Sequence, residues 1–335
     1  MAKKSMYLPL IVALIGAGLS PLASAQVVNP QEQVDTLEAL AGKQPTFRRA
    51  QAKGVCASGY FVGDAAGRAL SSASVFGGNK IPVIARFSVG GGNPKSIDKA
   101  KSVRGMALQF SLPNNEQWMM ANISTPMYFI SKAEQFTPFL QARLADPATG
   151  KPDPAKIKAF SDANPETTGQ AAYLAAGQIP MSFATIPYFG VNTFEFTNAK
   201  GESQFARWQF VASEPNAVLS PEQLAALPDN FLFEELRKRV AAAPVQFDFK
   251  VQFPEKGDPL VDATKVWPAE RKSVSAGKLT IDKVEAEAGG ACDKMTFNPL
   301  VLPAGIKPSA DPVLLARPAA YAVSLGRRLS ESAKP

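Results

Sequence analysis

The sequence predicts an α+β fold whose core is a closed or nearly closed antiparallel β-sheet. Two patterns lead to this class. Several short runs alternate apolar and polar residues, which is the period of a half-buried strand. Other segments repeat Ala, Leu, Glu and Lys at three- and four-residue spacing, which is the period of an amphipathic helix. Since neither an internal repeat nor a Ser/Gly linker divides residues 26–335, we expect a single domain there.

The strand signals are short and separated by turn residues. The predicted strands are residues 80–89, 104–112, 194–196, 205–211 and 247–253. A run of glycines, residues 90–92, lies between the first two. Because these glycines precede a strand and not a helix, they lack the helix N-terminus that a phosphate-binding loop requires, and we interpret them as a turn.

The helix signals lie between the strands and at the end of the chain. The predicted helices are residues 133–145, 154–162, 221–226, 232–242 and 312 to about 329. Ser220 has the residue type of an N-cap, Pro221 suits the first turn, and Gln223 occupies the capping-box position.

The first 25 residues have the pattern of a secretory signal peptide. Lys3 and Lys4 precede an apolar run from Tyr7 to Leu19, and small residues follow up to Ala25. The apolar run is shorter than the roughly 20 residues of a membrane span, so an anchor is the less favoured reading. We expect cleavage after Ala25, a periplasmic or secreted protein, and no membrane association after cleavage.

The composition excludes several kinds of site. The 335 residues include no histidine, so a Ser/His/Asp triad, a Cys/His dyad, a His-ligated zinc and a His-ligated haem are all absent. The formal net charge is +7, but no basic cluster is interleaved with aromatic residues. We therefore expect no nucleic-acid partner.

Export would place the two cysteines, Cys56 and Cys292, in an oxidising compartment. An even number of cysteines is compatible with a disulfide that joins an early segment to a late one. Two buried thiols are an equally good reading of the sequence alone.

Arg317, Tyr321 and Arg328 recur at steps of four and seven, which places all three on one face of a helix. One reading is a surface tyrosine between solvated charges. The other is a phenolate held ionised by a neighbouring guanidinium, which is a hard anionic ligand suited to ferric iron.

This stretch resembles the proximal helix of haem catalases, in which an Arg-x-x-x-Tyr pair supplies the axial phenolate. Other segments agree in order with that family, and the resemblance covers roughly residues 45–330. The chain looks like a short, exported, catalase-related peroxidase. The matching segments are residues 52–54, 86–88, 104–110, 125–126, 264–268, 297–299 and 316–321.

The resemblance implies a haem b (heme b) buried inside a closed, eight-stranded antiparallel β-barrel with flanking helices. The barrel would span about residues 45–280, and the proximal segment and helix about 290–330. Tyr321 would bind the iron and Arg317 would keep its oxygen anionic. The expected contacts with propionates are Arg48, Arg86 and Arg328, and those with the ring are Phe136 and Phe297, although either phenylalanine is equally well explained as core filler.

The distal side departs from the family. The family's distal histidine corresponds to Gln51, whose amide can donate and accept hydrogen bonds but has no usable pKa for proton transfer. Ser88 would then have no imidazole to hold. The family's distal amide corresponds by ungapped counting to Ile123, and Asn122 could take its place only if the strand were bulged there.

Three functions remain open. The first is a haem peroxidase that reduces hydrogen peroxide or small organic hydroperoxides with an unidentified external electron donor, weakened by the loss of the histidine. The second is a haem-binding protein with little turnover, such as a carrier, a sensor or an engineered variant. The third is a small-molecule binder without a cofactor. We expect a monomer or a small homo-oligomer.

Overall fold

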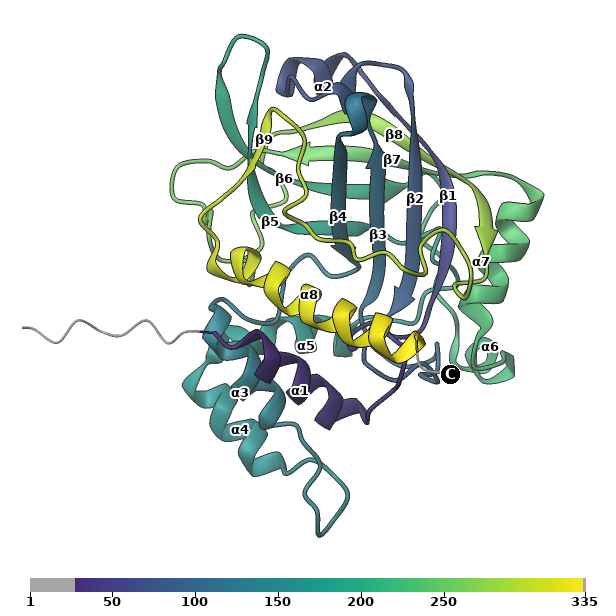
Figure 1. Ribbon diagram of the computed structural model, residues 1–335, viewed down its shortest axis with the longest axis vertical. Helices are drawn as coiled ribbons and strands as arrows, with labels where there is room; N and C mark the ends of the chain where they lie inside the picture. The colour runs from purple at the N-terminus through teal and green to yellow at the C-terminus, as the bar shows by residue number, and fades with distance from the viewer. Residues whose placement is uncertain (1–27, 334–335) are drawn as a thin grey trace, which may run out of the picture.

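A computed structural model describes residues 28–333 of the chain, and its centre is a closed antiparallel β-barrel (Figure 1). The strands pair in the order β4-β3-β2-β1-β8-β7-β6-β5, and a β4–β5 pairing closes the barrel. A short strand, β9 (Ile306–Pro308), extends the sheet at β5. The barrel strands are β1 (Gly54–Gly63), β2 (Lys80–Val89), β3 (Arg104–Ser111), β4 (Gln117–Ile123), β5 (Tyr188–Thr197), β6 (Ser203–Ala212), β7 (Val245–Gln252) and β8 (Ser273–Glu285).

All five predicted strands are present, and the closed eight-stranded barrel is confirmed. Sequence patterning missed β1, β4, β8 and the short β9. In β1 the reason is close backbone approach: a Cβ at Gly59 would lie 1.9 Å from the carbonyl oxygen of Thr280 in β8. The glycine that permits this contact also interrupts the alternation by which a strand is recognised.

The interior of the barrel is filled by side chains. The inward-facing residues of the strands form one continuous apolar core. Its centre is aromatic: the ring of Phe61 lies 5.5 Å from that of Phe110 and 5.8 Å from that of Phe249, and Trp118 lies 5.4 Å from Phe110. The expectation of a cofactor inside the barrel is therefore wrong for this chain, because close-packed aromatic residues occupy that space.

The predicted helices are also present. Residues 133–145 form a 3-10 turn (Ala133–Gln135) followed by a short helix. The capping box is confirmed, since the Ser220 side chain accepts from the backbone of Gln223 and the Gln223 side chain accepts from the backbone of Ser220. The helices are α1 (Pro30–Ala41), α2 (Ala65–Leu70), α3 (Phe136–Gln141), α4 (Pro154–Ala163), α5 (Gly169–Ala176), α6 (Pro221–Ala226), α7 (Phe231–Ala242) and α8 (Pro312–Ser332).

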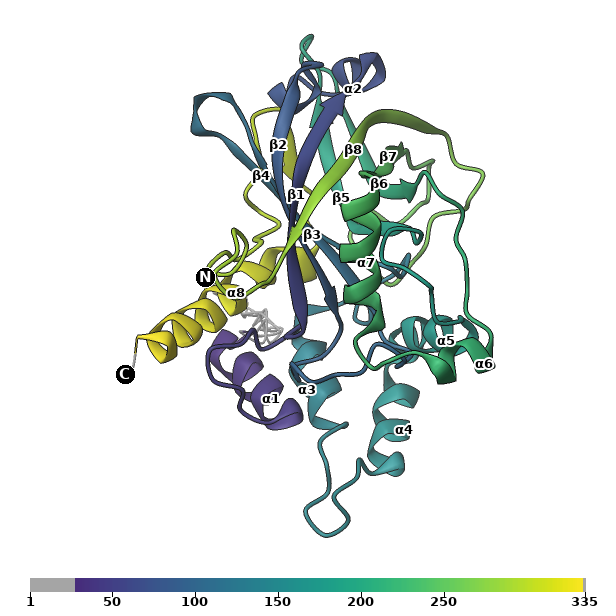
Figure 2. The ribbon, with the colours of Figure 1, turned by 90° about the vertical axis from the view of Figure 1, so that its right-hand side faces the viewer.

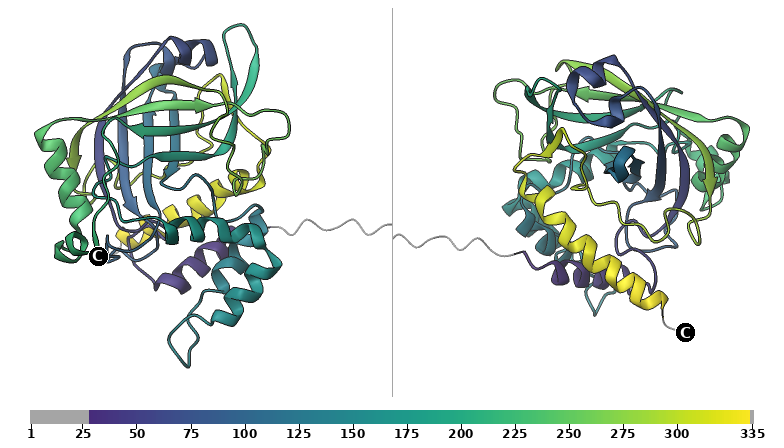
Figure 3. Two further views of the ribbon diagram at one scale, coloured as in Figure 1. Left: turned by 180° about the vertical axis from the view of Figure 1, so that it is seen from behind. Right: turned by 45° about the horizontal axis from the view of Figure 1, so that its top comes forward.

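The helices cover the outside of the barrel. Helix α8 crosses the strands β2–β4 near one end, and α1 lies beside it (Figure 1). Helix α7 packs on the other side, against β8 (Figure 2). Helices α1, α3, α4 and α5 gather below the barrel (Figure 3, left). The buried guanidinium of Arg49 joins Glu38 of α1 at 2.7 Å to Glu331 of α8 at 2.6 Å, which ties the two helices together.

The two cysteines form a disulfide. Cys56 in β1 is bonded to Cys292 in the segment that follows β8, with their Cα atoms 5.4 Å apart. Of the two readings of the sequence, the structure shows the paired one. The bond ties the segment around Cys292 to β1, where Phe297 packs with both cysteines.

Within residues 28–333, none of the helices has the length and the apolar character that crossing a membrane would require. The predicted signal peptide, residues 1–25, lies outside the described residues.

Candidate functional site

A single cavity brings the predicted site residues together. It lies between the outer face of β2–β4 and the helices α1, α3 and α8, and its empty space is about 1280 Å³ with the open mouth included. The predicted residues that border it are Arg48, Gln51, Arg86, Asn122, Phe136, Phe297, Arg317, Tyr321 and Arg328. Segments almost 300 residues apart in the sequence thus meet at one site.

Tyr321 and Arg317 are hydrogen-bonded to each other on the wall of this cavity. Arg317 donates two hydrogen bonds to the Tyr321 phenolic oxygen, from Nη2 at 2.7 Å and from Nε at 3.2 Å. Although burial alone lowers the pKa of Arg317, the two tyrosine oxygens nearby, of Tyr321 and Tyr128, raise it above its ordinary value. Two N–H groups of one cation therefore point at a single phenolic oxygen on the wall of the cavity.

A chain of buried hydrogen bonds positions Arg317. Asp311 caps α8, since its Oδ1 accepts from the backbone N–H of Val313 at 2.9 Å. Its other oxygen accepts from the Asn192 amide at 2.7 Å, and the Asn192 oxygen accepts from Arg317 Nη1 at 3.2 Å. Helix start and guanidinium orientation are therefore set by one carboxylate. Sequence analysis missed Asn192 and Asp311, although Asp-Pro is a typical helix start.

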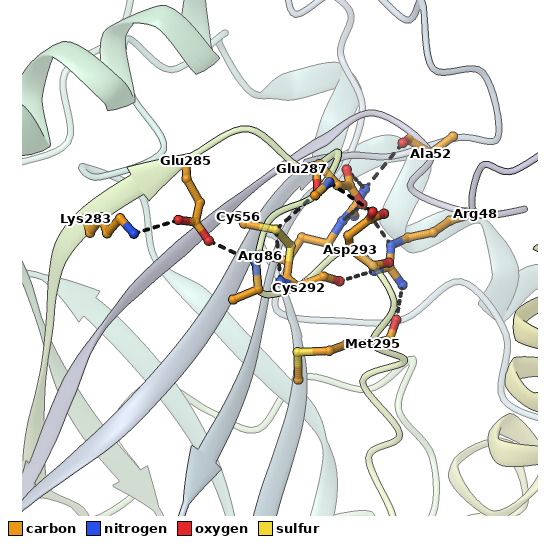
Figure 4. Close-up of a disulfide and its surroundings, with 12 residues drawn as sticks. Arg48, Ala52, Cys56, Arg86, Lys283, Glu285, Glu287, Cys292, Asp293 and Met295 are labelled. Carbon is orange, nitrogen blue, oxygen red and sulfur yellow. Dashed lines mark hydrogen bonds and ion pairs between the residues drawn. A yellow bond between two sulfur atoms is a disulfide. The ribbon is translucent and has the colours of Figure 1, made fainter. Parts of the chain in front are cut away.

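Arg48, Arg86 and Arg328 also border the cavity, and Figure 4 shows the first two beside Glu287. Arg86 pairs with both carboxylate oxygens of Glu287, at 2.7 and 2.8 Å, and Arg48 reaches the same group at 3.1 Å. Burial, together with the positive charges of Arg86 and Arg328, lowers the pKa of Arg48 to about 9. Among the described ion pairs, these three guanidiniums share one carboxylate, that of Glu287, which contacts Arg48 and Arg86.

The backbone holds these arginines in place. Arg48 and Arg328 both donate to the carbonyl oxygen of Met295, at 2.7 and 2.9 Å, in the segment that the disulfide fixes. Gly54 gives Arg86 its space, because a Cβ there would lie 2.3 Å from Arg86 Nη2. The cluster is therefore built into the fold and not formed by mobile surface side chains.

The distal side contains Gln51 and Ser88. Ser88 donates a hydrogen bond to Gln51 Oε1 at 2.8 Å. As expected, Ser88 has no imidazole to hold, and its hydroxyl is bonded to the amide oxygen of Gln51 in its place. Gln51 itself has φ +51°, in the left-handed region that residues other than glycine seldom adopt.

Asn122 does not meet the condition for a distal role. The β3–β4 register runs without a bulge from Gly105↔Ile123 to Ser111↔Gln117, so Asn122 stays paired with the core residue Met106. Its oxygen accepts from Trp208 Nε1 at 2.8 Å and its amide nitrogen donates to the Met106 carbonyl at 3.0 Å. Although Asn122 and Ile123 both border the cavity, both polar atoms of the Asn122 amide are therefore bonded to Trp208 and Met106.

The two predicted phenylalanines both border the cavity. Phe136 begins α3 and its ring lies 5.9 Å from that of Phe129. Phe297 packs with the disulfide and lies under the Arg48 guanidinium, 6.0 Å from ring centre to cation. Both positions suit contact with a flat apolar ligand, and that contact stays a prediction for each.

Sequence analysis missed the part of the wall that α1 provides. Gln33, Val34 and Leu37 line the cavity, and Asn29 caps this helix by accepting from two backbone N–H groups.

Tyr128 also faces the cavity, where burial raises its pKa to about 12. The described lining includes arginines and tyrosines but no Asp, Glu, Lys or Cys.

Comparison with known proteins identifies this architecture. A profile of the family described as Catalase matches residues 25–334. The chain belongs to the catalase family. It is 40% identical over 318 residues to a catalase-related peroxidase of Synechococcus elongatus, covering 95% of this chain and 94% of that protein. A catalase-related peroxidase of Mycolicibacterium paratuberculosis is 32% identical over 302 residues, covering 90% and 95%.

The solved structures agree with the fold. A fungal catalase superposes with a TM-score of 0.77 at 22% identity, covering 98% of this chain and 67% of that one. A bacterial catalase gives 0.75 at 22% identity, covering 97% and 68%. At this identity the likeness shows the shared barrel and helices alone.

The residues around the cavity fit the cofactor that the catalase family suggests, a haem. A haem carries two propionates, and the arginine cluster has two positive charges beyond those that Glu287 compensates. At the other end, Tyr321 offers a phenolic oxygen of the kind that ligates haem iron in catalase. Phe136 and Phe297 supply apolar walls between these ends.

The arginine cluster predicts a charge-dependent affinity. Arg328→Leu should weaken the binding of haem roughly tenfold to a hundredfold, because charge-assisted hydrogen bonds to a propionate are lost. Its effect on haem dimethyl ester, whose propionates are neutral, should be small. Absorption titrations of both compounds measure the ratio, and Arg271→Leu, far from the cavity, is the control. Equal weakening of haem and ester would contradict the assignment.

Proposed function

We propose that the protein is a haem-dependent peroxidase that reduces hydrogen peroxide or small organic hydroperoxides with an external electron donor, and that Tyr321 is the axial ligand of the iron. The observation that carries this proposal is the pair of hydrogen bonds from Arg317 to the Tyr321 oxygen on the wall of the cavity. Membership of a family that includes two catalase-related peroxidases supports a peroxide-acting oxidoreductase.

Each part of the cavity has a distinct task in this proposal. The bound haem supplies the redox-active iron. Arg317 keeps the Tyr321 oxygen anionic, and the chain from Asp311 through Asn192 keeps Arg317 oriented. The arginine cluster fixes the other edge of the porphyrin. The apolar side chains of Val34, Ile123 and others exclude water from its faces.

The distal side limits turnover. Cleavage of a peroxide is helped by a group that takes a proton from one oxygen and returns it to the other, and such general acid–base catalysis contributes about 10² to 10⁴ in rate. Gln51 cannot accept a proton near neutral pH, and Asn122 is occupied by Trp208. We therefore expect weak peroxidase activity that depends on hydroperoxide anion already present in solution.

Replacement of the phenol tests the axial assignment. Haem-reconstituted protein should show a ferric-tyrosinate absorption spectrum, and Tyr321→Phe should lose that spectrum and bind haem more weakly, because the anionic ligand is gone. Tyr173→Phe, at a largely exposed tyrosine, is the matched control. If the affinity and spectrum of Tyr321→Phe equal those of the parent protein, Tyr321 is not the ligand.

A second candidate function is a haem-binding protein with little turnover, which would be a carrier, a sensor or a variant inactivated by engineering. The absence of any Asp, Glu, Lys or Cys from the described lining of the cavity favours it. Gln51→His distinguishes the two candidates. If the protein is a peroxidase that lacks one group, peroxide consumption should rise 100-fold or more, within the range of about 10² to 10⁴ expected of acid–base catalysis.

The pH dependence gives the same experiment a second readout. The rate at which the parent protein consumes peroxide should increase with pH, by up to about tenfold per pH unit below the pKa of the peroxide. The reason is that the hydroperoxide anion, unlike the neutral peroxide, needs no base to remove a proton. Gln51→His should have a flatter profile. A rate and profile unchanged by the histidine would favour the binding protein.

We also propose that the chain is exported as a monomer or small homo-oligomer, with residues 1–25 as its signal peptide. The Cys56–Cys292 disulfide supports this, because such bonds persist in oxidising compartments. Protein recovered from the periplasm or medium should begin at Gln26, and its mass should rise by two hydrogens on reduction. Full-length protein retained in the cytoplasm with free thiols would contradict the proposal.

A further inference from the structure

We propose that the Cys56–Cys292 disulfide controls how firmly the protein retains haem. While the bond is intact, it holds residues 287–295 as a strap behind the arginine cluster, and its reduction releases the strap and weakens the hold on the propionates. This inference rests on the proposed haem function and adds a redox control to it. The arginine cluster comprises Arg48, Arg86 and Arg328.

The strap has few attachments of its own to the barrel. It follows β8 and contains neither a helix nor a strand. Its backbone–backbone hydrogen bonds among the described residues stay within the strap, as from Gly290 N–H to the Glu287 carbonyl at 2.9 Å. One bond reaches β8, from Ala291 N–H to Glu285 at 2.9 Å, and only Cys292 is buried. A segment with so little buried surface opens readily unless other contacts hold it.

Two arginines of the cluster bind the strap through its carbonyl oxygens. Arg48 donates to Cys292 at 2.8 Å and to Met295 at 2.7 Å. Arg328 donates to Met295 at 2.9 Å and also to Asp293. The disulfide lies in the middle of this set, since Cys292 itself supplies one of the acceptors. The position of the bonded sulfur and the position of the Arg48 guanidinium are therefore linked through a single residue.

The third arginine is linked to the disulfide from the barrel side (Figure 4). Arg86 in β2 is the direct cross-strand partner of Cys56 in β1. It pairs with both oxygens of Glu287, at 2.7 and 2.8 Å. The N–H of Cys292 also donates to Cys56 Sγ at 3.1 Å. The covalent bond and the ion pair therefore attach the strap to adjacent strands at the same level of the barrel.

The strap offsets the repulsion between the guanidiniums. Burial and the charges of Arg86 and Arg328 lower the pKa of Arg48 to about 9. Like charges this close stay together because oxygens of the strap accept their N–H groups. Release of the strap removes the Glu287 carboxylate, which competes with a propionate, but it also frees the arginines to turn apart. Donors already in place bind an anion more tightly than donors that must first be gathered, so release lowers the affinity for propionates.

Reduction of the bond requires a dithiol as the reductant. The dithiol transfers two electrons and two protons, the bond between the two sulfurs breaks, two thiols form, and the dithiol becomes a disulfide. Cys56 and Cys292 are both 0% exposed, so the dithiol reaches them when the strap opens. A bound propionate keeps the arginines and hence the strap in place. Haem binding and reduction therefore oppose each other, as linkage requires.

Hydrogen exchange followed by mass spectrometry tests the strap without haem. Reduction of the parent protein with dithiothreitol should speed amide exchange in residues 286–296 by about tenfold or more and leave β7 unchanged. The double variant Cys56→Ser/Cys292→Ser should exchange like the reduced parent protein and should not respond to dithiothreitol. Equal exchange in the oxidised and reduced parent protein would overturn the proposal.

Transfer of haem to an excess of apomyoglobin tests the effect on the cavity. The reduced parent protein and the double variant should release haem about tenfold faster than the oxidised protein, as expected when a hydrogen bond to a charged group is lost. Release of haem dimethyl ester, whose propionates are neutral, should change little. Because the double variant has no disulfide, any response of its haem release to dithiothreitol measures a direct effect on the iron and is subtracted.

The outcomes separate this inference from the proposed function. Equal acceleration of haem and ester release would overturn the inference, because that result reports general loosening of the protein. Haem release that is unchanged by reduction, with the haem spectrum in place, would also overturn it and leave the proposed function intact. Absence of any haem spectrum in the parent protein would refute the proposed function, and with it the role of the disulfide in haem retention.

Discussion

The proposed function depends on one contact, the guanidinium of Arg317 held against the phenolic oxygen of Tyr321. A neutral phenol is a poor ligand for ferric iron, whereas a phenolate is a strong one, so in this proposal the two N–H groups of Arg317 would keep the Tyr321 oxygen able to bind the iron. The contact is itself supported from outside the helix. Asp311 both starts α8 and, through Asn192, orients Arg317, so the local fold and the chemistry of the ligand depend on the same carboxylate.

The cavity lies against the outer face of the barrel, and the interior of the barrel is filled by side chains. Its interior is packed with aromatic residues, and the rigidity that results fixes Arg86 and Ser88 on the outer face of β2. Helices α1, α3 and α8, together with Thr296 and Phe297 of the disulfide-linked segment, form the rest of the cavity lining. Under the proposed function, Tyr321 and the arginine cluster would hold the haem, while Gln51 stands where the family has a proton carrier.

Much of this architecture could be predicted from the sequence, for physical reasons that differ between elements. Spacing along one helix placed Arg317, Tyr321 and Arg328 together, because helical geometry is local. Strands such as β2 and β7 show a clear alternation of apolar and polar residues. In β1 this alternation is interrupted by Gly59, a glycine that the close contact with β8 requires. The position of the cavity could not be predicted from local patterns, and neither could the use of Asn122 by the barrel core or the partner of Ser88. Each depends on register between strands distant in sequence.

The central claim is tested most directly by a crystal structure of the protein reconstituted with haem. Our account predicts that the iron is bonded to the oxygen of Tyr321, that Arg317 still donates to that oxygen, and that both propionates lie among Arg48, Arg86 and Arg328. A porphyrin bound elsewhere, or an iron whose protein ligand is any other side chain, would contradict it.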